Sequence, residues 1–191
     1  MARITCLAAA ALALPGAALA TPASEGPAPT TAAFSLSGAA PKACGLGTAG
    51  QSTLDIGEMV DASTGELAAI SNPPSTSITG SWCNTASTVS VVATPLVAQS
   101  FAGQPPTGFT KAVNYTATVS AWSTNAAAFA TNGNEAGVQR DTTPGSQPQP
   151  APTATTIDVA VGSFAAPAAS DFLVADTDYS GAITITLTPN S

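Results

Sequence analysis

The sequence predicts an all-β protein, folded as an antiparallel sandwich or barrel. Short stretches in which apolar and polar residues alternate recur along the chain, and the clearest of them spans residues 111–121. Thr and Val are frequent, and Gly and Pro separate the alternating stretches, which is typical of strands joined by turns. Beyond residue 20 we find no helical periodicity, internal repeat or second-domain boundary. We therefore expect one domain over residues 33–191.

Residues 1–20 have the pattern of a signal peptide. Arg3 supplies the positive charge, the run from Ile4 to Ala20 is apolar, and small residues precede a cleavage site before Thr21. We therefore expect a bacterial protein that is secreted to the periplasm, the cell surface or the medium. Residues 21–32 are rich in Pro and are expected to form a flexible lead-in.

Removal of the leader would also remove Cys6, and the two remaining cysteines are Cys44 and Cys83. A pair of cysteines in an exported protein predicts a disulfide. A loop of this length contributes about 4 kcal/mol by the chain-entropy estimate. The alternatives are two buried free thiols or a metal site. A metal site is disfavoured because the chain has no His and two thiolates do not complete a tetrahedral shell.

The charge of the chain disfavours several classes of partner. Its formal net charge is −7, and only Lys42, Lys111 and Arg140 are cationic after the leader. Nucleic acid is an implausible partner because phosphate contacts need clustered Lys and Arg, and an anionic membrane surface is disfavoured for the same reason. No apolar run after residue 20 approaches the ~20 residues of a membrane span.

In the first half of the domain, residues 33–39 alternate and are expected to form a strand with Phe34 and Leu36 on one face. Four further strands are expected, in chain order, at residues 52–57, 66–70, 76–83 and 87–93. Their inward pairs are predicted to be Leu54 with Ile56, Ile78 with Trp82, and Val89 with Val91.

In the second half, a loop is expected over residues 94–110 and a longer exposed loop over about residues 123–153. The longer loop could contain one helical turn at 126–130 and polyproline II near 142–152. Strands are expected at 111–121, 155–161 and 179–188, and residues 164–178 are expected to form a connection. Their inward side chains are predicted to be those of Val113, Tyr115, Ala117, Val119, Ala121, Ile157, Val159, Val161, Ile183, Ile185 and Leu187.

Four short motifs resemble bacterial chaperone–usher pilus subunits and, more closely, secreted domains of the spore coat protein U type. They are FSLSGAAPKAC (34–44), LDIGEM (54–59), SWCN (81–84) and YSGAITITLTP (179–189). The resemblance implies an immunoglobulin-like sandwich in which the two cysteines join the first and second strands. Members of the family often lack the last strand, and an extension of a neighbouring subunit fills the gap.

Phe34 and Leu36 would be the strand-exchange face under this resemblance. The expected partners are copies of the chain or related subunits, and a periplasmic chaperone. The chain ends in Thr188-Pro189-Asn190-Ser191, whereas pilus subunits tend to carry a Tyr second from the end, which argues against capture by a chaperone. The alternative is that residues 33–39 pair within their own chain and give a self-complete monomer.

A metal site and an active site are both expected to be absent, and no cofactor is expected. Asp176, Asp178 and Ser180 match the first, third and fifth places of a calcium loop, but Leu187 stands where a bidentate Glu is needed. Without His no Ser-His-Asp or Cys-His arrangement is available. The candidates for paired carboxylates are Asp55, Glu58, Asp61 and Glu66, and residues of this kind on turns and strand ends usually face solvent.

The two tryptophans are assigned different roles. Trp82 is expected in the core beside the disulfide, whereas Trp122 falls on the polar face of its strand and is a possible ligand-stacking residue. The sequence therefore predicts a non-enzymatic, secreted structural protein of the cell surface, similar to a pilus or coat subunit. The alternative is a monomeric secreted module that binds carbohydrate or another surface.

Overall fold

The computed structural model describes residues 31–191 of the chain. The predicted signal peptide and residues 21–30 of the lead-in lie outside the described residues. The chain divides after Ala39 into two units. The first contributes residues 31–39 and the second comprises residues 40–191.

The described residues contain strands and no helix, so none of them lies in a helix that could cross a membrane. The larger sheet has the order β1-β3-β10-β7-β5-β12, with β2 paired to β3 and β8 paired to β7. Its strands are β1 (Cys44–Gly45), β2 (Thr48–Ala49), β3 (Ser75–Cys83), β5 (Leu96–Ala98), β7 (Ala112–Ser120), β8 (Ala127–Ala130), β10 (Thr153–Ala165) and β12 (Tyr179–Ser180).

The second sheet has three antiparallel strands, β13 (Ile183–Pro189), β4 (Ser87–Ala93) and β9 (Gly145–Gln149), with β4 in the centre. A two-stranded pair of β6 (Phe109–Thr110) and β11 (Phe172–Leu173) is parallel, and the other strand pairs are antiparallel. The prediction of an all-β, antiparallel fold is thus confirmed, with this one short parallel pair as an addition.

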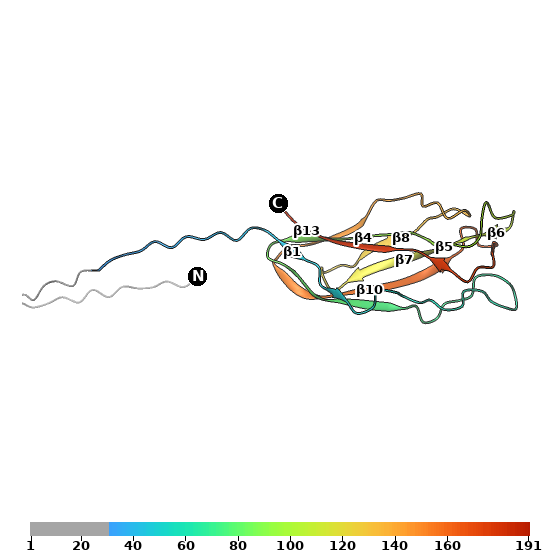
Figure 1. Ribbon diagram of the computed structural model, residues 1–191, viewed down its shortest axis with the longest axis horizontal. Helices are drawn as coiled ribbons and strands as arrows, with labels where there is room; N and C mark the ends of the chain where they lie inside the picture. The colour runs from blue at the N-terminus through green and yellow to red at the C-terminus, as the bar shows by residue number, and fades with distance from the viewer. Residues whose placement is uncertain (1–30) are drawn as a thin grey trace, which may run out of the picture. The chain divides into compact units, whose positions relative to one another are not determined.

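The two sheets pack face to face around one apolar core, and Figure 1 shows β13 and β4 on one side of it and β10 on the other. Residues at alternate positions of β4, β7 and β10 fill this core because successive side chains of a strand point to opposite faces. The inward side chains are those of Val89, Val91, Val113, Tyr115, Ala117, Val119, Ile157, Val159 and Val161. All nine were predicted to face inward. The immunoglobulin-like strand order that the resemblance implies stays a prediction.

The predicted final strand is interrupted. It forms two strands, β12 and β13, separated by Gly181 and Ala182. At Gly181 the chain crosses so close to the turn after β4 that a Cβ would lie 2.8 Å from the carbonyl oxygen of Pro95. β12 therefore pairs with β5 in the larger sheet, while β13 pairs with β4 in the second.

The expectation that Ile78 and Trp82 share a face is wrong because β3 contains a bulge. Ile78 is opposite Ile157 on β10, but Ser81 is opposite Thr155, so β3 has one extra residue between these pairs. Gly80 in this stretch has φ +82, which glycine adopts without strain. The extra residue reverses the alternation, so Ser81 and Cys83 are buried and Trp82 is exposed.

Two predicted loops contain strands that the sequence reading missed. In the 123–153 loop, residues 127–130 form β8 instead of a helical turn, with Ala127 and Phe129 inward. The predicted polyproline stretch contains β9, whose Pro148 is tolerated because β9 lies at the edge of its sheet. The 94–110 loop contains β5 and β6.

Three predicted strands do not form. Residues 33–39 and residues 52–57 have no strand partner among the described residues, and residues 66–70 contain only an isolated bridge between Leu67 and Val60. Alternation shows that a segment is suited to a strand, but a strand also needs a neighbouring edge with free backbone groups. Residues 52–57 run past the end of β3, which begins at Ser75, so no strand of the larger sheet lies beside them.

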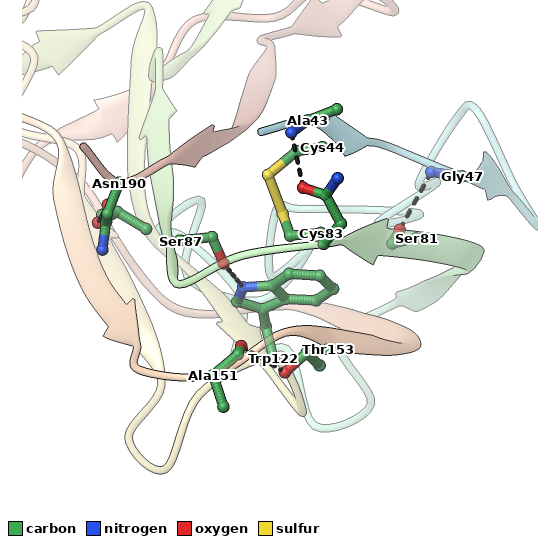
Figure 2. The surroundings of a disulfide bond; sticks show 12 residues. Ala43, Cys44, Gly47, Ser81, Cys83, Ser87, Trp122, Ala151, Thr153 and Asn190 are labelled. Carbon is green, nitrogen blue, oxygen red and sulfur yellow. Dashed lines mark hydrogen bonds between the residues drawn. A yellow bond between two sulfur atoms is a disulfide. The ribbon is translucent and has the colours of Figure 1, made fainter. Parts of the chain in front are cut away.

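The predicted disulfide between Cys44 and Cys83 is present and joins β1 to β3 at directly opposite positions. Figure 2 shows Ala43 beside it. The amide of Ala43 donates a hydrogen bond of 2.7 Å to the side-chain oxygen of Asn84. The same side chain donates to the carbonyl of Pro41 at 2.8 Å. The disulfide and these hydrogen bonds hold residues 41–44 against the end of β3.

We expect the Cys44→Ala, Cys83→Ala double variant to lose about 4 kcal/mol of unfolding free energy, because the 39-residue separation makes the bridge an effective constraint on the unfolded chain. Urea unfolding followed by circular dichroism measures this loss. An oxidised parent protein whose midpoint equals that of the variant would contradict the expectation.

Candidate functional site

One long side of the sandwich is closed by backbone contact between the sheets. β8 of the larger sheet and β9 of the second approach so closely that a Cβ at Gly145 would overlap the carbonyl oxygen of Ala128. Glycine at this position permits the approach. The free edge of β9 is therefore covered, and this side offers no room for another strand.

The opposite side of the sandwich is open. β13 pairs with β4 along one edge and has no strand on its other edge among residues 31–191. Ile183, Ile185 and Leu187 point from β13 toward the core but are only partly buried. β13 thus combines unpaired backbone groups with an apolar face that the chain itself does not fully cover.

Facing β13 across this opening is a segment that we call the strap, residues 52–58. Leu54 and Ile56 of the strap are partly buried against the core, and Asp55 between them is exposed. We call this opening the seam groove. It lies between the strap on one side and β12 and β13 on the other.

The seam groove contains two adjoining cavities. The first, of about 500 Å³, reaches the core between the sheets. Its floor is apolar and is formed by Ile78, Leu96, Tyr115, Val159 and Val161. Ile183 and Ile185 of β13 form one wall, and Leu54 and Ile56 of the strap form the other. A hollow with this lining suits large apolar side chains that follow one another at every second position of a strand.

The second cavity, of about 1190 Å³, continues the groove past β12. It shares Leu54, Ile56 and Tyr179 with the first, so the two cavities adjoin. Its floor includes Leu173 and Val174, and its rim carries the carboxylates of Asp55, Glu58, Asp176 and Asp178. This end of the groove is therefore acidic at its mouth and apolar at its base.

Asp176 has a structural role in this rim. Its carboxylate accepts hydrogen bonds from the backbone amides of Ser100 at 2.7 Å, Phe101 at 3.1 Å and Asp178 at 3.0 Å. These bonds, led by the one from Asp178, lower the pKa of Asp176. No group of three or more His, Cys, Asp or Glu side chains in residues 31–191 is placed to hold a metal ion. The calcium-like spacing of Asp176 and Asp178 thus coincides with a turn held by amide donors.

The two tyrosines of the chain both lie at the seam groove. Tyr115 donates from its hydroxyl to the carbonyl of Ala182 at 3.4 Å, and Tyr179 donates to the carbonyl of Val174 at 2.7 Å. Burial raises the pKa of Tyr115 to about 12. Burial and, to a smaller extent, the negative charge of Asp176 raise the pKa of Tyr179 to about 12. Both phenols therefore stay protonated at neutral pH and act as hydrogen-bond donors.

The structure reverses the roles predicted for the two tryptophans. Trp122 is 1% exposed, and its indole nitrogen donates to the hydroxyl of Ser87 at 3.2 Å, as Figure 2 shows. The reversal begins at Ala121, whose φ of 67 ends the alternation of β7 and turns Trp122 inward. Trp122 therefore cannot stack on a ligand from solvent. Trp82 is 44% exposed and is not a core residue.

Phe34 and Leu36, the predicted strand-exchange face, are exposed at 87% and 97%. Residues 31–39 are not in a strand, so the alternative in which they complete the sheet of their own chain is not what the structure shows. The segment keeps the alternation of two large apolar side chains with Ser35 and Ser37 between and after them. Two such exposed apolar side chains are costly in water unless something covers them.

The sequence identified the apolar residues of the seam groove only as strand faces. Ile183, Ile185, Leu54 and Ile56 were predicted only to lie on the inward faces of their strands. Their partial exposure depends on which strands become neighbours, and no local sequence signal shows that.

Comparison with known proteins adds no relative. No family model, curated protein or solved structure matches the chain.

We expect both tyrosines to titrate near pH 12 in the folded protein, compared with about 10 for an exposed phenol. Between these values the unfolded chain loses the phenolic protons and the folded chain keeps them, so the free energy of unfolding falls as the pH rises through this window. Absorbance at 295 nm measures the titration. A single transition at pH 10 before unfolding would contradict it.

Proposed function

We propose that this protein is a secreted structural subunit that assembles by taking an extended segment of a second copy into its seam groove. The observation that carries the proposal is the edge of β13. Among residues 31–191 β13 has no strand partner on one side, and its apolar face borders a cavity of about 500 Å³ that opens to the core. An added strand would pair with this edge and fill the cavity with alternate side chains.

The occupant that the chain itself offers is the segment around Phe34 and Leu36. These two side chains are two positions apart, so in an extended strand they point in the same direction. Ile183 and Ile185 of β13 have the same spacing and line the cavity. Phe34 and Leu36 are almost fully exposed in the single chain, so their transfer into an apolar groove is favourable.

Two contributions favour assembly. Full burial of Phe and Leu side chains contributes about 1.5–3 kcal/mol each. The hydrogen bonds along a newly paired strand add about 0.5–1.5 kcal/mol each. The disulfide joins Cys44, eight residues after Leu36, to β3. The exchanged segment would therefore be linked to its own sandwich at a fixed point.

An extracytoplasmic location supports the same proposal. A disulfide between cysteines persists in oxidising compartments and is rare in a reducing cytosol. The sequence pattern of residues 1–20 is that of an exported protein. We therefore place the assembly in the periplasm, on the cell surface or outside the cell, where pilus and coat subunits of the family that this chain resembles act.

We expect the Phe34→Ala, Leu36→Ala double variant to stay monomeric at concentrations at which the parent forms oligomers, because it lacks the side chains that fill the cavity. The dissociation constant should rise by at least about a hundredfold, from the burial of two large side chains. Size-exclusion chromatography with light scattering over a concentration series measures the effect.

The matched control is Ser35→Ala, Ser37→Ala, which changes the same segment on its other face and should assemble like the parent. A parent that is monomeric over the whole range, or a double variant that assembles equally well, would overturn the proposal. Circular dichroism of both variants checks that the sandwich is unchanged.

A second candidate, a monomeric module that binds carbohydrate, is favoured by one observation. Trp82 is 44% exposed on the outer face of its sheet, and its neighbours on the adjacent strands are the small residues Gly45 and Ala154. A Cβ at Gly45 would lie 2.5 Å from the indole nitrogen, so only glycine allows the ring to lie in this place. The flat ring is therefore accessible for stacking on a sugar.

If the protein binds glycans in this way, Trp82→Ala should abolish binding on a glycan array, whereas Trp122→Phe should retain it. The reason is that Trp82 is accessible and Trp122 is enclosed. Binding that survives Trp82→Ala, or an array on which the parent binds nothing, would remove this second candidate.

A further inference from the structure

We infer that Asn132 is a latent site of covalent modification: the folded chain keeps it from forming a succinimide, and the side chain of Asn114 is the group that prevents the reaction. We call residues 131–141, which follow β8, the Asn132 loop. The reaction takes place within one chain, so it does not depend on the assembly proposed above.

Asn132 and Gly133 form the only Asn-Gly pair in the sequence. In such a pair the backbone nitrogen of the glycine can attack the side-chain carbonyl carbon, Cγ, of the asparagine, because glycine has no side chain to obstruct the approach. The new bond between nitrogen and Cγ closes a succinimide ring. The bond from Cγ to Nδ2 breaks, and Nδ2 leaves as ammonia with the proton that the glycine amide loses. Water then opens the ring to give aspartate or isoaspartate.

The fold uses both members of this reactive pair. Oδ1 of Asn132 accepts hydrogen bonds from the backbone amides of Arg140 at 3.0 Å and Asp141 at 2.9 Å, so this side chain joins the two ends of the Asn132 loop. At Gly133 a Cβ would lie 2.8 Å from Cγ of Pro95, so a larger residue does not fit without movement of the chain. The loop therefore keeps a chemically labile pair for structural reasons.

Asn114, on β7, holds the nitrogen that would attack. The amide of Gly133 donates to Oδ1 of Asn114 at 2.7 Å, and the side-chain nitrogen of Asn114 donates to the carbonyl of Gly133 at 3.1 Å. The same Oδ1 accepts from the hydroxyl of Thr131 at 3.2 Å, and Gly133 itself is buried. The amide must lose its proton before its nitrogen can attack. A buried amide whose proton is hydrogen-bonded loses it only when the structure opens locally.

The carbon that would be attacked has no comparable protection. Asn132 is exposed, and the two amides that donate to its Oδ1 polarise the carbonyl group. Amide donors in this position stabilise the negative charge that develops on the oxygen when a nucleophile adds to the carbon. Protection of the site therefore depends on the nitrogen of Gly133, which makes Asn114 the controlling residue.

Modification to isoaspartate would make a transient opening of the Asn132 loop permanent. The loop is packed against its neighbours: the amide of Lys111 donates to the carbonyl of Glu135 at 3.0 Å, and a Cβ at Gly137 would lie 2.6 Å from Cγ2 of Val97 on β5. Isoaspartate adds a methylene group to the backbone, and packing this close does not accommodate added backbone length. A chain modified while the loop is open would therefore not regain these contacts.

Peptide mapping by mass spectrometry tests the inference on the full chain, incubated in mildly alkaline buffer. The folded parent should keep Asn132, whereas the same chain unfolded in urea should convert it to aspartate and isoaspartate. In the folded Asn114→Ala variant the conversion should be at least about tenfold faster than in the folded parent, because both hydrogen bonds to the Gly133 peptide group are lost. The matched control is Asn114→Asp, which keeps an acceptor for the Gly133 amide and should react at a rate close to that of the parent.

Three results would overturn the inference. One is a folded parent that loses Asn132 as fast as the unfolded chain. Another is an Asn114→Ala variant that reacts at the parent's rate while circular dichroism shows an intact sandwich, and the third is equal rates for Asn114→Ala and Asn114→Asp. If Asn114→Ala does not fold, hydrogen exchange in the parent decides. The Gly133 amide should exchange at least about a hundredfold more slowly than in the unfolded chain, and exchange at the unfolded rate would overturn the inference.

Discussion

The unpaired edge of β13 is the constraint on which the rest of the structure depends. Backbone amides and carbonyls need partners, and a sandwich normally supplies them from its own strands or covers the edge. Here the opposite side is closed by the contact of β8 with β9. The open side combines free backbone groups with the partly buried side chains of Ile183 and Ile185.

The disulfide fixes the start of the path by which the chain reaches the open side of the sandwich. By joining β1 to the end of β3, it fixes Cys44 opposite Cys83 at the start of the sandwich. It also starts the run of β1 and β2 along β3 that delivers the strap to the open side. The path of the chain after Cys44 therefore leads to the strap, which lines the open side opposite β13.

Short-range backbone geometry decides which side chains reach the core and which reach solvent. One extra residue in β3 near Gly80 exposes Trp82, and the positive φ of Ala121 buries Trp122. Each reversal changes the role of a whole aromatic residue. Trp122, which alternation placed on the polar face of its strand, is therefore buried. Trp82, which alternation placed in the core, is exposed.

The sequence by itself determined the all-β class, the disulfide, and the inward faces of β4, β7 and β10, because alternation and composition are local properties that report on burial directly. Only the tertiary structure decided that β3 ends before the strap, that residues 127–130 become β8, and that one side of the sandwich stays open. A segment suited to a strand becomes one when a free edge lies beside it, and the neighbours of each segment are set by contacts between residues far apart in the chain. Residues 33–39 and 52–57 show this most clearly, since both have the pattern of a strand and neither has a partner within the described chain.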